Sequence, residues 1–305
     1  MSDVITIELD DLLTVDERHI IMNYIKLFHF KIECVKDTNM NIVLSQTSLN
    51  KAPNEVDIAH KFASNYFLKC QSQYNMIQEF IPIIIKYPNS ELALFLAINI
   101  RQHMIKMAQK LNVNSEMFQK YKNNLLSLFQ NIISANEIKY ELIDNISASI
   151  TVLIIIGFQG QWTSGIDQLI SAAKEQSKTN PRYNLIATLI LSNIDNIFNQ
   201  IEKIIDIKSS NFILHIFDTY SNVINDYINF LLINSFSGPK ENFVNGVEFK
   251  SFISMLQSHK YFKINIIKIH GFLDFLINCI SSIENNNDFI SQICELFESI
   301  FSEEK

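Results

Sequence analysis

A central stretch at residues 136–173 constrains the fold more than any other part of the chain. Both of its halves carry apolar residues at three- and four-residue steps, the spacing of one face of an α-helix. These are Ile138, Leu142, Ile146, Ile150 and Leu153, then Ile166, Leu169, Ile170 and Ala173. Gly157, Gly160 and Gly165 lie between the halves, and glycine tolerates the conformations in which a helix ends and the chain reverses. Neither helix of this predicted hairpin can bury its apolar face alone, so both require neighbouring helices.

The composition favours long helices with few interruptions. The chain has 305 residues but only 6 Gly and 5 Pro, whereas sheet folds need many turn residues. Hydrophobic residues make up 48% and charged residues 19%, so burial is ample and global disorder is not expected. The length exceeds that of one ordinary compact core, which favours two domains or one extended repeat array.

The net charge of −7 makes a basic protein partner a better fit than a nucleic acid, whose binders carry basic surfaces. The four cysteines lie far apart and form no CxxC pair; they are Cys34, Cys70, Cys279 and Cys294. We therefore expect no zinc site, and we expect the cysteines to be reduced, buried thiols. The N-terminus lacks a signal-peptide pattern. The apolar runs are shorter than the ~20 residues of a membrane span, so no span is expected.

Helical periodicity extends over most of the chain. It predicts helices near residues 15–30, 55–72, 73–87, 89–110, 114–134, 182–201, 209–233, 261–283 and 288–301, in addition to the central hairpin, and a short helix with a loop at 243–259. Pro181 is expected to open the helix near 182–201. Residues 1–54 are predicted to form an N-terminal extension with one helix and a linker from residue 36.

Residues 55–305 are predicted to form a helical repeat array with a break near 235–246, where Gly238 and Pro239 signal a turn. Helix pairs begin near residues 55, 89, 136 and 182, a period of about 35 to 46 that is typical of HEAT and armadillo repeats. The predicted fold is an all-α, right-handed HEAT/armadillo-like α-solenoid of antiparallel helix pairs without a sheet.

The order of these segments resembles the N-terminal part of importin-β superfamily nuclear transport receptors, closest to the transportin-3/importin-13 branch. Residues 59–107 look like the first repeat with the opening helix of the second, and YKNNLLSLFQNI resembles the next helix. ISASITVLIIIGFQGQW is similar to a helix that ends in a tryptophan, with Trp162 at the matching place, and KINIIKIHGFLDFLINCI resembles a later repeat. The likeness covers roughly residues 55–300.

The chain also departs from that family. The tryptophan of the first hairpin is absent, although Tyr74 lies nearby, and the segment before residue 50 does not match. Such receptors are considerably longer. The resemblance therefore implies either the N-terminal portion of a receptor or a shortened relative with a different role.

The resemblance implies that the partners are the Ran GTPase in its GTP form and basic protein cargo. The family's inner helices bind Ran, and Glu79 falls where the first of them tends to carry an acid. Asp167 and Glu175, on the third predicted inner helix, are candidates to join it. An acidic concave surface would attract a Lys/Arg-rich partner. The alternative is that all three are ordinary solvated helix residues. A receptor would be found in the cytoplasm and nucleus.

The sequence offers little for catalysis. There is no GxxxxGK or GxGxxG motif, and His103, His215 and His270 lack a nearby arrangement that resembles a triad. We therefore expect no enzyme activity, catalytic residue, cofactor or metal site. Trp162 is expected to pack as a plug at its turn, with a binding hot spot as the alternative. The alternative function is a non-transporting α-solenoid scaffold that contacts neighbouring subunits of a larger complex.

Overall fold

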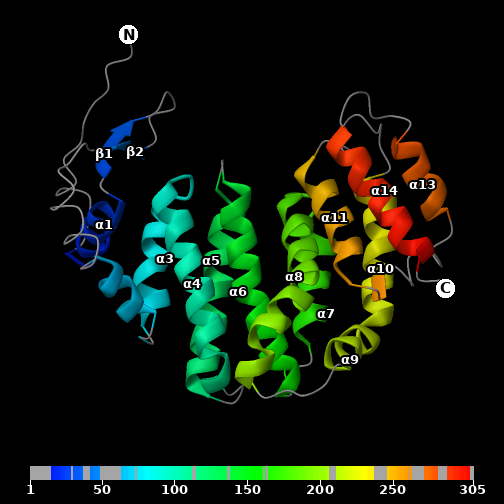
Figure 1. Ribbon diagram of the computed structural model, residues 1–305, viewed down its shortest axis with the longest axis horizontal. Coiled ribbons are helices and arrows are strands. Elements are labelled where there is room, and N and C mark those ends of the chain that lie inside the picture. Colours follow the sequence, from blue (N-terminus) through cyan, green and yellow to red (C-terminus); the bar gives the residue numbers. More distant parts are fainter. Residues whose placement is uncertain are drawn as a thin grey trace, which may run out of the picture. The chain divides into compact units, whose positions relative to one another are not determined.

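The computed structural model describes residues 15–28, 30–36, 42–48, 63–71, 73, 75–111, 115–135, 138–160, 162, 164–205, 211–236, 246–259, 261–262, 271–280 and 287–302. This described part is predominantly α-helical (Figure 1), which confirms the predicted helical character. The chain divides into a first unit, residues 1–107 and 120–149, and a second unit, residues 108–119 and 150–305. The separate predicted boundary at residue 54 stays a prediction.

The first unit begins with a helix and a β-hairpin. Its elements are α1 (Val15–Phe28), β1 (Phe30–Lys36), β2 (Ile42–Ser48), a helical segment at residues 63–70, α3 (Met76–Lys86), α4 (Glu91–Met107), most of α5 (Glu116–Ile133) and the first half of α6 (Tyr140–Gln159). Helices α3 and α4 pack against each other, and α1 contacts β1 and α3. The helices predicted near residues 15–30, 73–87 and 89–110 are thereby confirmed.

The hairpin corrects the prediction that the chain contains no sheet. Strands β1 and β2 pair antiparallel, with Phe30 opposite Ser48 and Lys36 opposite Ile42. Residue 36 onward was expected to be a linker, but β2 lies within that segment. The signal was a period of two in FKIECVK and the β-branched residues of IVLSQTS, both of which favour strands.

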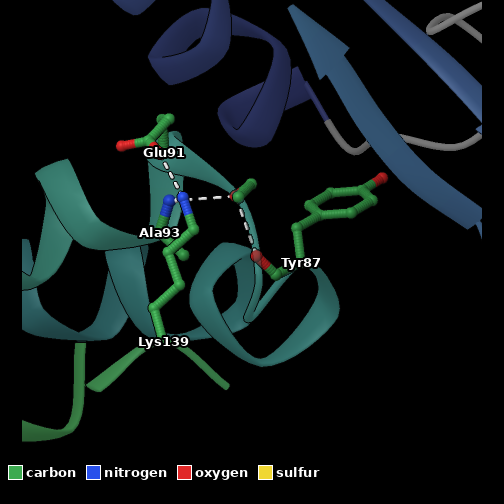
Figure 2. Close-up of polar contacts among 5 residues, drawn as sticks. Tyr87, Glu91, Ala93 and Lys139 are labelled. Carbon is green, nitrogen blue, oxygen red and sulfur yellow. Dashed lines mark hydrogen bonds and ion pairs between the residues drawn. The ribbon is translucent and has the colours of Figure 1, made fainter. Parts of the chain in front are cut away.

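Helix α4 begins at a serine cap. Ser90 Oγ accepts a hydrogen bond from the Ala93 N–H at 3.0 Å, and its hydroxyl donates to the Tyr87 carbonyl at 2.8 Å. Glu91, in the first turn, forms an ion pair with Lys139 Nζ (Figure 2). Because this ion pair is half-exposed, it contributes at most about 1 kcal/mol to stability.

Replacing Ser90 with alanine is expected to lower the free energy of unfolding by about 1 kcal/mol, because the Ala93 N–H loses its cap. Urea denaturation measures the change. The matched control is Ser127→Ala at an exposed position of α5, where alanine should be neutral or slightly stabilising. Equal destabilisation by both substitutions would contradict the capping role.

The second unit contains the remaining helices. They are the 3₁₀ turn η2 (Ala108–Lys110), α7 (Gly165–Gln176), α8 (Arg182–Ile205), α9 (Phe212–Thr219), α10 (Ser221–Phe230), the π-turn η3 (Leu231–Ser235), α11 (Val247–Ser258), α13 (Phe272–Ile280) and α14 (Asn287–Ser302). Helix α7 contacts α8 and α10, α8 contacts α11, and α11 contacts α14. Their buried faces consist mainly of isoleucine, leucine and phenylalanine.

Two predicted long helices are interrupted. The helix expected over 209–233 divides at Tyr220 (φ −102°, ψ 13°) into α9 and α10, and it then widens into η3. The helix expected over 261–283 is broken at Gly271, whose φ of 77° is left-handed and favours glycine. By contrast, α8 begins at Arg182, directly after the predicted Pro181, and Asn180 Oδ1 accepts a hydrogen bond from the Arg182 N–H at 3.1 Å. The predicted turn at Gly238 lies outside the described residues.

Helix α6 is more apolar than the short runs of the sequence suggested. It has 20 residues, and an 18-residue window reaches a mean hydropathy of 1.7, so by length and composition it could cross a membrane. However, 78% of that window is buried within the protein. A buried core helix passes the same test, so this single helix is weak support for a span.

Candidate functional site

The three predicted partner-binding acids fall in both units. Glu79 lies in the first turn of α3, is half-buried, and accepts a hydrogen bond from the Asn75 side-chain amide. Asp167 lies in the first turn of α7 and is half-buried, whereas Glu175 lies near the end of α7 and is exposed. Eight residues of helix separate these last two by about 12 Å. That Glu79 joins them on one surface stays a prediction.

Asp167 also has a neighbour inside the protein. Burial raises the pKa of Tyr220 to about 12, and the nearby Asp167 carboxylate adds to the rise. Asp167 is therefore close to the junction of α9 and α10, in agreement with the contact between α7 and α10. Of the two acids on α7, Glu175 is the more available to a partner.

Trp162 packs between two glycines, as predicted for a plug at the turn from α6 to α7. A Cβ added at Gly157 would come within 2.4 Å of Trp162 Cε3, and one at Gly165 within 3.3 Å of Cη2. The backbone N–H of Trp162 donates to the Gly157 carbonyl at 2.8 Å, and the indole ring makes an edge contact with Phe118 at 5.9 Å between centroids. The two glycines thus provide the space that the indole occupies.

A buried polar cluster surrounds His103. This fully buried side chain contacts the Gln71 carbonyl through Nδ1 and the Tyr121 hydroxyl through Nε2, both at 2.8 Å. A carbonyl only accepts, so Nδ1 carries the proton and Nε2 accepts from Tyr121. The Gln71 side chain in turn donates to Asn99 Oδ1 at 2.7 Å and accepts from Lys106.

The His103 cluster has the character of a structural tie rather than of a catalytic site. Burial lowers the pKa of His103, with Lys106 acting in the same direction and the Gln71 carbonyl opposing it. The cluster links the end of the segment at 63–71 to α4 and α5, and its polar groups satisfy one another. No sequence motif predicts it, because Gln71 and Tyr121 lie 32 and 18 residues from His103 in the sequence.

A pocket of about 370 Å³ lies in the second unit, where the start of α8, η3 and the start of α11 meet. Its polar lining includes Ser177, Asn184, Asn234, Ser235 and Glu248. Its apolar lining includes Leu231, Phe236 and Phe249. The volume falls at the lower end of the range of ligand pockets, about 300–1,000 Å³. Its size is sufficient to receive a side chain or another small group from outside the protein.

The wall of this pocket is held by hydrogen bonds. Asn184 donates through Nδ2 to Ser235 Oγ at 3.0 Å and accepts at Oδ1 from the Tyr227 hydroxyl at 3.2 Å. Burial raises the pKa of Tyr227 well above its ordinary value, so this hydroxyl remains a donor. In η3, the Phe236 N–H reaches the Leu231 carbonyl at 3.0 Å, which closes the π-turn. Such turns often occur at functional sites.

Known proteins provide no further guide to the site. No family model, curated protein or solved structure matches the chain. Within the described residues, no group of three or more His, Cys, Asp or Glu side chains is placed to hold a metal ion. The site's chemistry must therefore be inferred from the acids on α3 and α7 and from the pocket.

Proposed function

We propose that this chain is a protein-interaction subunit built as an array of antiparallel helix pairs, and that it serves as an importin-β-type nuclear transport receptor. The contact pattern of the second unit is the observation that supports an array of helix pairs. Helix α7 contacts its successor α8 and also α10, while α8 contacts α11 (Figure 1). A helix that touches both its neighbour and a later helix is what stacked two-helix repeats require.

The proposed partner is the GTP form of Ran, with basic protein cargo, in the cytoplasm and nucleus. The sequence resemblance supplies this candidate, and two physical features support a basic partner. The chain has a net charge of −7, and Glu175 projects from α7 into solvent. Acidic surfaces accelerate encounter with Lys/Arg-rich proteins. In the proposal, Glu79, Asp167 and Glu175 provide the acidic contacts.

Replacing Glu79, Asp167 and Glu175 together with lysine is expected to abolish retention of Ran-GTP in a pulldown. The fold should persist, because exposed or half-exposed charges contribute little to stability, and circular dichroism with a thermal midpoint checks this. The matched control replaces three exposed acids, Glu116, Glu141 and Glu298, with lysine. It changes the net charge by the same amount but should retain Ran-GTP.

The unmutated protein decides whether the receptor proposal holds at all. Retention of Ran-GTP but not Ran-GDP supports it, whereas binding of neither form, or equal binding of both, rejects it. Loss of binding in both triple variants would mean that overall charge, not these three positions, governs the interaction.

The second candidate is a non-transporting scaffold that contacts neighbouring subunits of a larger complex. The β1–β2 hairpin favours it, because this element precedes the array in a segment that the receptor resemblance does not cover. Co-purification of the tagged chain in a stable assembly that lacks Ran would support the scaffold. Release from its partners on addition of Ran-GTP would reject it.

A further inference from the structure

We propose that the pocket between the start of α8, η3 and the start of α11 binds the guanidinium group of an arginine on a partner polypeptide. The inference rests on the proposed function in one respect, that this chain is a protein-interaction subunit. It does not depend on Ran being the partner. None of the three acids proposed to contact Ran lines this pocket.

The charge of the pocket calls for a cation. Among the described lining residues, Glu248 is the one with a charged side chain, and no ion pair or hydrogen bond of its carboxylate occurs in the described part of the chain. The residue is half-buried. A partly desolvated carboxylate gains most from a cation that also donates hydrogen bonds to it.

The remaining polar groups favour a guanidinium over an ammonium. Ser177, Asn234 and Ser235 line the pocket together with Glu248, and their side chains carry hydroxyl or amide oxygens that can accept hydrogen bonds. A guanidinium presents five N–H donors in a fixed planar fork, whereas an ammonium concentrates three donors at one point. Acceptors distributed over three elements therefore match arginine better than lysine.

The apolar walls suit the rest of an arginine side chain. Pro181 is the exposed apolar residue of the lining, and methylene groups can pack against it, whereas Leu231, Phe236 and Phe249 are at most 4% exposed and form the closed base of the pocket. A pocket of about 370 Å³ has room for one such side chain and ordered water.

The pocket is organised before any ligand arrives. Asn184 is held by hydrogen bonds with Tyr227 and Ser235. The π-turn η3 and the residue after it place Leu231, Asn234, Ser235 and Phe236 along one wall of the pocket. Because these groups need not be ordered on binding, little of the interaction energy is lost to that cost.

The test uses the full chain and a fluorescein-labelled Gly-Gly-Arg-Gly-Gly peptide, followed by fluorescence polarisation. Matched peptides carry citrulline, which is neutral and nearly isosteric, or lysine. The citrulline peptide is expected to bind at least about tenfold more weakly, because a charge-assisted hydrogen bond is lost. The lysine peptide is expected to bind several-fold more weakly than the arginine peptide.

Two variants place the peptide in this pocket. Glu248→Gln should weaken the arginine peptide about tenfold and leave the citrulline peptide unchanged. Ser177→Phe should weaken both peptides, because it fills the pocket while keeping its charge. The control Glu298→Gln, at an exposed position of α14, should change neither affinity. Equal binding of arginine and citrulline, equal binding of arginine and lysine, or no effect of Glu248→Gln would each overturn the proposal.

The same variants separate this proposal from that of Ran binding. Glu248→Gln is expected to retain Ran-GTP, while the triple lysine variant at Glu79, Asp167 and Glu175 is expected to retain the arginine peptide. Selective arginine binding without any Ran binding would support the pocket and reject the receptor. Ran-GTP binding without selectivity for the arginine peptide would support the receptor and reject the arginine pocket.

Discussion

Gly157→Ala is expected to make the protein about 1–3 kcal/mol less stable than Gly165→Ala. The added methyl at residue 157 would lie 2.4 Å from Trp162 Cε3, a distance that forces the indole to move. The methyl at residue 165 would lie 3.3 Å from the ring, which a small shift accommodates. Both glycines are in helices, so both variants share a gain in helix propensity of up to about 1 kcal/mol.

Urea denaturation of both variants measures this difference, and a double-mutant cycle identifies its cause. In a Trp162→Leu background, where the clashing ring is gone, Gly157→Ala and Gly165→Ala should have nearly equal effects. If Gly157→Ala remains more destabilising in that background, the ring is not what the glycine accommodates.

His103→Leu is expected to lower the free energy of unfolding by about 3 kcal/mol or more at pH 8. The substitution removes two buried hydrogen bonds, to the Gln71 carbonyl and to the Tyr121 hydroxyl, and lost bonds between buried groups cost about 1–3 kcal/mol each. Leucine approximates the size of the imidazole, so a cavity contributes little. A loss below 1 kcal/mol would show that the cluster is not a structural tie.

The same histidine is expected to make stability depend on pH. Burial lowers the pKa of His103 in the folded protein below its ordinary value of 6.5. In the unfolded chain the imidazole takes up a proton as the pH falls through about 6.5, while in the folded protein it does so only at lower pH. The unfolded state then binds more protons, so stability is complete above that pH and declines below it, by up to about 1.4 kcal/mol per pH unit.

Urea denaturation between pH 8 and pH 5 measures the decline, and His103→Leu should remove this component. The control is His215→Gln, at an exposed position of α9, which should leave the pH profile of the unmutated protein in place. Identical profiles for the unmutated protein and His103→Leu would contradict the assignment.

The helices were predictable because each buries a periodic apolar face, a local property that the order of residues expresses directly. Thus the central hairpin appears as α6 and α7, and the start of α8 follows from Asn180 and Pro181. The break at Tyr220 was not predictable in this way, because apolar periodicity runs across it. The sequence of β1 does alternate apolar and polar residues with a period of two, which indicates a strand. The low content of Gly and Pro indicates the opposite, a chain without a sheet, and the prediction followed the composition.

The sequence by itself determined that the chain is largely helical, acidic, and dependent on contacts between helices for burial. Only the tertiary structure decided which polar residues meet. Gln71, His103 and Tyr121 lie far apart in sequence, as do Asn184, Ser235 and Glu248. Helical periodicity specifies the face on which a side chain lies, but not which later helix covers that face. A buried cluster or a pocket depends on which helix covers that face, and packing between elements that are distant in sequence determines this.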